Sequence, residues 1–115
     1  MEDPEVRVRQ DVVDAKDNYG RQFQVFSENF YLMKAALRYF TVNQGLSFTS
    51  SKVADNFPLN VSTAGSCLKI MEELGVIESR TSSRKRFLPG SSDLDRMEEV
   101  EQVLRNNFEI REFNP

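Results

Sequence analysis

Four polar residues in the middle of the chain have the side-chain types and the spacing to contact a nucleic acid. They are Ser62, Thr63, Ser66 and Lys69. If Ala64, Leu68 and Met71 point inward, these four lie on the opposite face of one helix. Their hydroxyls and ammonium group can reach phosphate oxygens and base edges. This face has no Arg or Asn for bidentate base recognition, so we expect modest sequence specificity.

A dense basic cluster follows this helical segment. Its members are Arg80, Arg84, Lys85 and Arg86. Residues 31–90 carry eight Lys and Arg against four Asp and Glu, whereas residues 1–30 and 91–115 are acidic on balance. Because nucleic acids respond to the local field, the net charge of −3 does not exclude binding. We expect the cluster to contact phosphates, with Ser50 and Lys52 as further contacts; a solvated turn is the alternative.

The residue types argue against an enzyme. The chain has no His, which removes the commonest general base and zinc ligand. It has no glycine-rich phosphate loop. Its single Cys67 makes a Cys-based metal site improbable and is expected to be a small half-buried filler rather than a redox sensor. We therefore predict no catalytic residue, no metal and no cofactor.

Two helices joined by a tight turn would position the polar face. Hydroxyls at residues 49–51 can cap a first short helix with Val53 and Ala54 inward. Phe57-Pro58 ends that helix because proline disfavours helical geometry in the residue before it. Asn60 or Ser62 can cap the second helix. Gly75 stops it, since glycine readily adopts the left-handed conformation at a helix end.

The residues after Gly75 predict a β-hairpin. Val76-Ile77 would begin the first strand and residues 81–83 would form the turn. The return strand would run over residues 84–88 and end at Pro89-Gly90.

The segment S-T-A-G-S-C-L-K-I-M-E-E-L-G-V-I (residues 62–77) resembles the recognition helix and first wing strand of winged helix-turn-helix proteins of the MarR/ArsR type. Leu68, Leu74, Gly75 and Val76-Ile77 stand in the expected places. The resemblance covers about half of the chain once the preceding helix is included. It implies a DNA-binding fold in which one helix lies in the major groove.

The flanks complete the expected architecture. Residues 21–43 predict a scaffold helix with an apolar stripe, and residues 1–20 are expected to be a flexible acidic arm. Residues 91–115 predict a C-terminal helix. Its apolar seam would be buried by a second copy of the chain, or would pack on its own domain. The seam comprises Leu94, Met97, Leu104 and Phe108.

The sequence thus predicts a mainly α fold with a small β-hairpin: a winged helix-turn-helix over residues 21–90 with an added C-terminal helix. The expected function is double-stranded DNA binding by a homodimeric transcriptional regulator. The alternative is a protein-protein interaction module within a larger nucleic-acid complex, because fold does not fix function. No apolar run approaches the ~20 residues of a membrane helix, so we expect an intracellular, cytoplasmic protein without a membrane partner.

Overall fold

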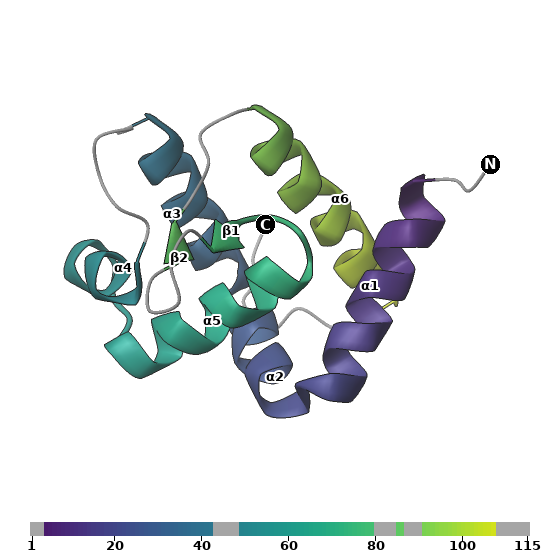
Figure 1. Cartoon of the computed structure of the whole chain (residues 1–115), viewed down its shortest axis with the longest axis horizontal. Helices are drawn as coiled ribbons and strands as arrows, with labels where there is room; N and C mark the ends of the chain where they lie inside the picture. Colours follow the sequence, from purple (N-terminus) through teal and green to yellow (C-terminus); the bar gives the residue numbers. More distant parts are fainter. Residues whose placement is uncertain (1–3, 43–48, 80–84, 87–90, 108–115) are drawn as a thin grey trace.

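The computed structural model describes residues 4–42, 49–79, 85–86 and 91–107. These residues form six helices: α1 (Pro4–Asn18), α2 (Gly20–Glu28), α3 (Phe30–Val42), α4 (Ser50–Asn56), α5 (Val61–Glu73) and α6 (Ser91–Asn107). Helix α5 packs against α2 and α4, while α1 packs against α6 and α2. Figure 1 shows α1 and α6 next to each other at one end of the molecule, and α4 at the other.

Helix α1 corrects the expectation of a flexible N-terminal arm. Val8 and Val12 are fully buried and Ala15 is nearly so. Their spacing of four and three places them on one helical face, which packs against α6 and α2. This apolar stripe is short and its side chains are small, so it was not recognised in the sequence. Residues 4–18 therefore belong to the folded body.

The predicted scaffold helix is two helices with a break at Asn29. The Asn29 backbone N–H donates to the carbonyl oxygens of Phe26 and Val25, and its side-chain Nδ2 also donates to Val25 O, at 2.9 Å. Short polar side chains compete in this way with the helical backbone ladder. The break lets the apolar stripes of α2 and α3 both face the core.

Aromatic rings fill the centre of that core, as the nine Phe residues suggest. Phe26, Phe30 and Phe40 are fully buried. Phe26 and Phe30 meet edge to face, with ring centroids 5.5 Å apart and an interplanar angle of 82°, a favoured geometry for aromatic pairs. Burying each ring contributes roughly 1.5–3 kcal/mol. These contacts join α3 to α2, and α2 packs against α5.

The prediction of a winged fold with a β-hairpin is wrong. Within the described part of the chain, extended pairing is limited to two residues on each side, β1 (Glu78–Ser79) antiparallel to β2 (Lys85–Arg86). Val76 and Ile77, the expected start of the first strand, instead donate their N–H groups to Met71 O at 2.9 and 3.4 Å. They close the end of α5. The architecture is helical, and a pairing of two residues on each side does not make a β-hairpin wing.

Helix α6 is the predicted C-terminal helix, but its apolar seam faces its own domain. Met97 and Leu104 are fully buried in the monomer, and Leu94 is partly buried against the same core. Phe108 lies outside the described residues. Since Met97 and Leu104 have no surface left for a partner, the expectation that they form a dimer seam is wrong, and the intramolecular alternative holds.

Candidate nucleic-acid interface

Helices α4 and α5 form a helix-turn-helix with both starts fixed by local caps. Thr49 Oγ1 accepts a hydrogen bond from the Lys52 N–H at 3.2 Å. Asn60 Oδ1 accepts one from the Thr63 N–H at 2.7 Å. Such caps contribute about 1 kcal/mol each by satisfying otherwise unpaired helical N–H groups. The start of α5 is thus defined by Asn60, one of the two caps that the sequence left open, and the alternative cap Ser62 lies inside the helix.

The far end of α5 is fixed as firmly. Gly75 has φ +76°, and its N–H donates to Glu72 O at 3.1 Å while the Val76 N–H donates to Met71 O at 2.9 Å. This pair of bonds is the Schellman arrangement that ends many helices. The stop predicted at Gly75 is confirmed.

The exposed face of α5 is concentrated at its N-terminal half. Val61 and Ser62 are exposed, and Thr63, Gly65 and Ser66 are half-buried. A Cβ at Gly65 would come within 4.0 Å of Ser50 Cβ on α4, so the two helices lie close together here. On α4, Ser50 is half-buried and Lys52 is exposed. Five predicted contact residues thus lie on two helices that pack against each other: Ser50, Lys52, Ser62, Thr63 and Ser66.

Val61 was not among the predicted site residues. It is 51% exposed at the first position of α5, directly beside Ser62. Helical phase did not reveal it: Val61 lies three residues before Ala64 and seven before Leu68, on the same stripe. Its exposure goes with its place at the very start of α5.

Lys69 is separated from this group. Its Nζ lies 4.9 Å from the centroid of the Tyr19 ring and 3.7 Å from Glu73 Oε1, with 40% of its side chain exposed. Cation–π and ion-pair contacts of this kind hold an ammonium group in place. Lys69 thus points toward the junction of α1 and α2, whereas Ser62 lies at the other end of α5.

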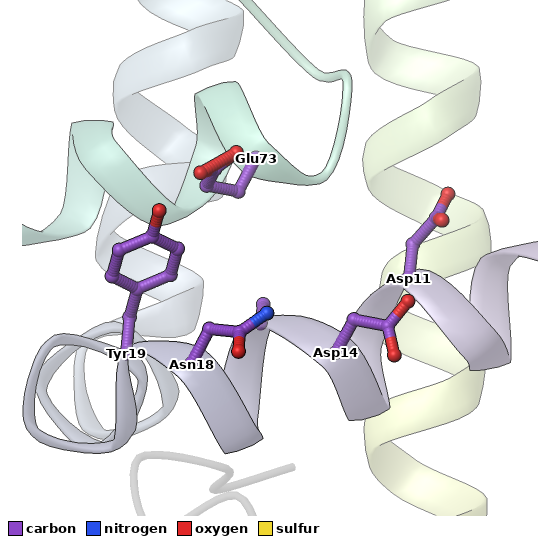
Figure 2. Close-up of a pocket in the computed structure, with 6 residues that line it drawn as sticks. Asp11, Asp14, Asn18, Tyr19 and Glu73 are labelled. Carbon is purple, nitrogen blue, oxygen red and sulfur yellow. The ribbon is translucent and has the colours of Figure 1, made fainter.

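A carboxylate-lined hollow of about 160 Å³ lies beyond Lys69, between α1 and α5. Figure 2 shows its lining residues Asp11, Asp14, Asn18, Tyr19 and Glu73. Two of the carboxylates are already engaged, since Asp11 accepts from Arg96 Nη2 at 2.6 Å and Asp14 from Gln10 Nε2 at 2.9 Å. The C-terminal half of α5 therefore lies beside carboxylates, whereas its first turn has no acidic residue.

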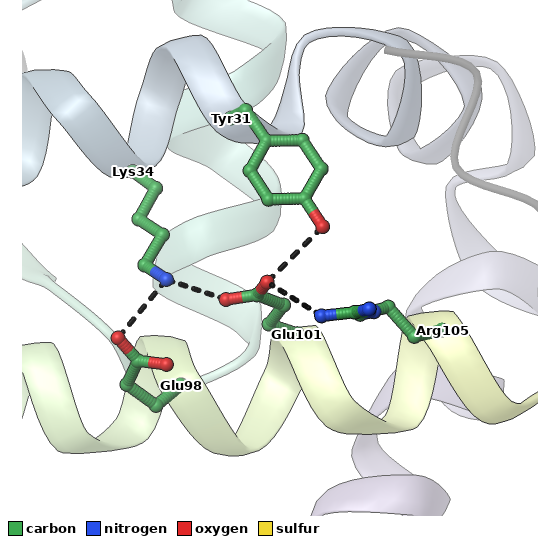
Figure 3. A network of polar contacts seen from close by, with 5 residues as sticks. All are labelled: Tyr31, Lys34, Glu98, Glu101 and Arg105. Atoms are coloured by element: carbon green, nitrogen blue, oxygen red, sulfur yellow. Dashed lines mark hydrogen bonds and ion pairs between the residues drawn. The ribbon is translucent and has the colours of Figure 1, made fainter. Parts of the chain in front are cut away.

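A polar network joins α3 to α6 on the side drawn in Figure 3. The Glu101 carboxylate, only 7% exposed, accepts hydrogen bonds from Tyr31 Oη at 3.0 Å and from Lys34 Nζ. Arg105 lies 3.7 Å away on the next turn of α6, and Lys34 Nζ also lies 3.0 Å from Glu98 Oε1. Removing one partner would leave a buried charge uncompensated, so the network fixes α6 against α3.

The network changes how its members titrate. Burial alone would raise the pKa of Glu101, but the hydrogen bonds from Lys34 and Tyr31 and the charges of Lys34 and Arg105 outweigh it and lower the pKa below 4.5. Burial opposes the charged form of Lys34, yet its bonds to Glu101 and Glu98 raise its pKa above 10.5. The pKa of Tyr31 is raised above 10.0 by burial and by its bond to Glu101. All three shifts favour the paired state near neutral pH.

The predicted residues that remain are the basic cluster and Cys67. Arg80 and Arg84 lie outside the described residues, and Lys85 and Arg86 are described only through the backbone of β2. Cys67 is fully buried, and burial raises the pKa of its thiol to about 12, so it packs in the core as a thiol rather than a thiolate.

Comparison of the chain with protein-family models, curated proteins and solved structures found no match. Within the described ranges, no group of three or more His, Cys, Asp and Glu is arranged to hold a metal ion. None of the described helices has both the length and the apolar character to cross a membrane.

Proposed function

We propose that this chain binds double-stranded DNA through α4 and α5, with the N-terminal half of α5 in the major groove. The observation that carries the proposal is the first turn of α5, in which Val61 and Ser62 are exposed and Thr63 is half-buried. Its side chains are small, so the helix backbone can approach base edges closely. In helix-turn-helix proteins, the N-terminal residues of the second helix contact the bases.

The distribution of charge along α4 and α5 supports the orientation in which the N-terminal half of α5 faces DNA. Neither α4 nor α5 has an acidic residue in its first turn, and the N-terminus of a helix carries a partial positive charge. Lys52 is exposed on α4, where it can contact a phosphate. The C-terminal half of α5 borders the carboxylates of Asp11, Asp14 and Glu73. This polarity directs the N-terminal half of α5 toward DNA.

The basic cluster in the sequence would add phosphate contacts. The backbone of Lys85 and Arg86 pairs with Glu78–Ser79, a few residues after α5 ends. Electrostatic contacts of this kind supply most non-specific affinity for DNA. A regulatory role in transcription is the proposed use of such binding.

Ser62→Glu tests the proposal. It places a negative charge in the groove-facing turn, while a glutamate near a helix N-terminus does not weaken the helix. We expect affinity for short duplexes, measured by fluorescence anisotropy, to fall by about tenfold or more, the scale of a charged contact. Gln102→Glu makes the same charge change on an exposed position of α6 and should leave affinity unchanged. Equal affinities for the two variants would contradict the proposal.

Protein docking is the second candidate function. Tyr39 is 38% exposed and Val42 is 76% exposed near the end of α3, and aromatic residues are enriched at protein interfaces. Single exposed apolar side chains are common on soluble proteins. A folded protein that fails to retard any duplex at low salt would favour this candidate over DNA binding.

A further inference from the structure

Val61 is the apolar residue of α5 that its own domain leaves exposed. The other large apolar side chains of this helix are buried in the core, and they include Leu68, Ile70 and Met71. Val61 follows the capping residue Asn60 and is 51% exposed. Burial of its two methyl groups would be favourable in any complex that covers the start of α5.

The polar residues around Val61 offer little base discrimination. Serine and threonine hydroxyls both donate and accept, so Ser62 and Ser66 can pair with any base edge. The bond that Asn60 Oδ1 accepts from the Thr63 N–H at 2.7 Å holds this amide at the helix cap, whereas bidentate adenine recognition needs both its oxygen and its nitrogen directed at the base. Lys69 is directed toward Tyr19 and Glu73. Val61 supplies the apolar contact that these polar side chains do not.

In the major groove, thymine is the base that presents an apolar group, its C5 methyl. We propose that Val61 selects thymine by packing against this methyl group. The inference rests on the proposed DNA binding and adds to it a specificity-determining residue. It predicts that duplexes enriched by the protein contain a required thymine whose methyl group, rather than its hydrogen-bonding edge, is recognised.

Replacement of thymine by deoxyuridine tests this contact, because uracil lacks the methyl group and keeps the same hydrogen-bonding groups. Duplexes enriched by the wild-type protein from a random-sequence pool serve as probes, with each thymine replaced in turn. One replacement should weaken wild-type binding by about fourfold, the effect of exposing one methyl-sized group. Val61→Ala should bind the thymine duplex more weakly and bind both duplexes equally.

Two variants control the experiment. Val61→Thr keeps one γ-methyl group and should retain part of the preference for thymine. Val42→Ala makes the same truncation at an exposed valine of α3 and should retain the full wild-type preference. A thymine preference that persists unchanged in Val61→Ala, or a wild-type protein indifferent to every replacement, would overturn the assignment of Val61. A wild-type protein that binds no duplex would overturn the proposed function itself.

Discussion

Arg96 on α6 donates a hydrogen bond from Nε to Leu74 O at 2.8 Å, at the C-terminal end of α5. The same guanidinium donates from Nη2 to Asp11 on α1 at 2.6 Å. A cation at this end of a helix also complements the helix dipole. One side chain thus joins three helices and fixes the end of α5 that lies farthest from the proposed DNA contact.

Arg96→Met should lower the free energy of unfolding by about 1.5–3 kcal/mol, the range for charge-assisted hydrogen bonds. The variant leaves Leu74 O and the Asp11 carboxylate without their donor. Urea unfolding followed by circular dichroism measures the change. Arg105→Met removes a more exposed and longer contact (3.7 Å, 44% exposed), so its effect should stay below about 1 kcal/mol. Equal losses in both variants would contradict the role given to Arg96.

Stability should fall at acid pH because of Glu101. Its pKa is lowered in the folded state, so its stabilising contribution is present above its unfolded pKa and is lost as pH falls through the folded pKa. Glu101→Gln should be less stable than wild type at neutral pH and should lose less stability below about pH 4.5. Glu98→Gln, at a carboxylate that is 52% exposed, should keep the wild-type dependence of unfolding free energy on pH. If the free energy of unfolding depends on pH in the same way in wild type and Glu101→Gln, the role given to Glu101 is refuted.

At alkaline pH, the stability of the fold should fall as the pH rises. Lys34 and Tyr31 have raised pKa values in the folded state, so their contributions are present below their unfolded pKa values and are lost as pH rises through the folded ones. Tyr31→Phe should reduce the loss of stability above about pH 10. Tyr39→Phe is the matched control on the same helix, and thermal unfolding over the pH series measures both. An identical loss of stability at alkaline pH in Tyr31→Phe and wild type would contradict the role given to Tyr31.

Leu104→Asp should unfold the monomer. Leu104 is fully buried, and an unpaired carboxylate in that position carries a penalty well above the 2–5 kcal/mol of a Leu→Ala change. Far-ultraviolet circular dichroism provides the readout. Asn106→Asp, at an exposed position of the same helix, should remain folded. A folded, monomeric Leu104→Asp protein would restore the case for an intermolecular seam.

The two lysines of the helix-turn-helix should differ in their contribution to DNA binding. Lys52 is exposed beside the first turn of α4, whereas Lys69 faces Tyr19 and Glu73. Lys52→Gln should reduce the slope of log affinity against log salt by about 0.9, the loss of one phosphate contact. Lys69→Gln should change that slope less. A larger change for Lys69→Gln would place the DNA at the C-terminal half of α5.

Local signals allowed helices α4 and α5 to be predicted, although the sequence left both Asn60 and Ser62 open as caps of α5. The caps and the stop at Gly75 act through hydrogen bonds that span three to five residues along the chain, so the nearby sequence specifies them. The break at Asn29 and the helix end formed by Val76 and Ile77 were missed, because alternative hydrogen bonds decided the backbone there.

Features that depend on tertiary contacts could not be predicted from the sequence alone. Tyr31 and Glu101 are separated by 70 residues, and the hollow near Glu73 needs α1 to be folded against α5. The residues of α1 looked polar because three small apolar side chains carry its packing. The same contact between α1 and α5 explains why Lys69 does not join the polar face predicted from helical phase.

Backbone amide chemical shifts during titration with a short duplex test the central claim most directly. Nuclear magnetic resonance at low salt would report which segment meets the DNA. We predict that the largest changes occur in residues 50–52 and 61–66, with little change along the outer faces of α1 and α6. Changes concentrated on α1 and α6, or none at a duplex excess, would contradict DNA binding through the N-terminal half of α5.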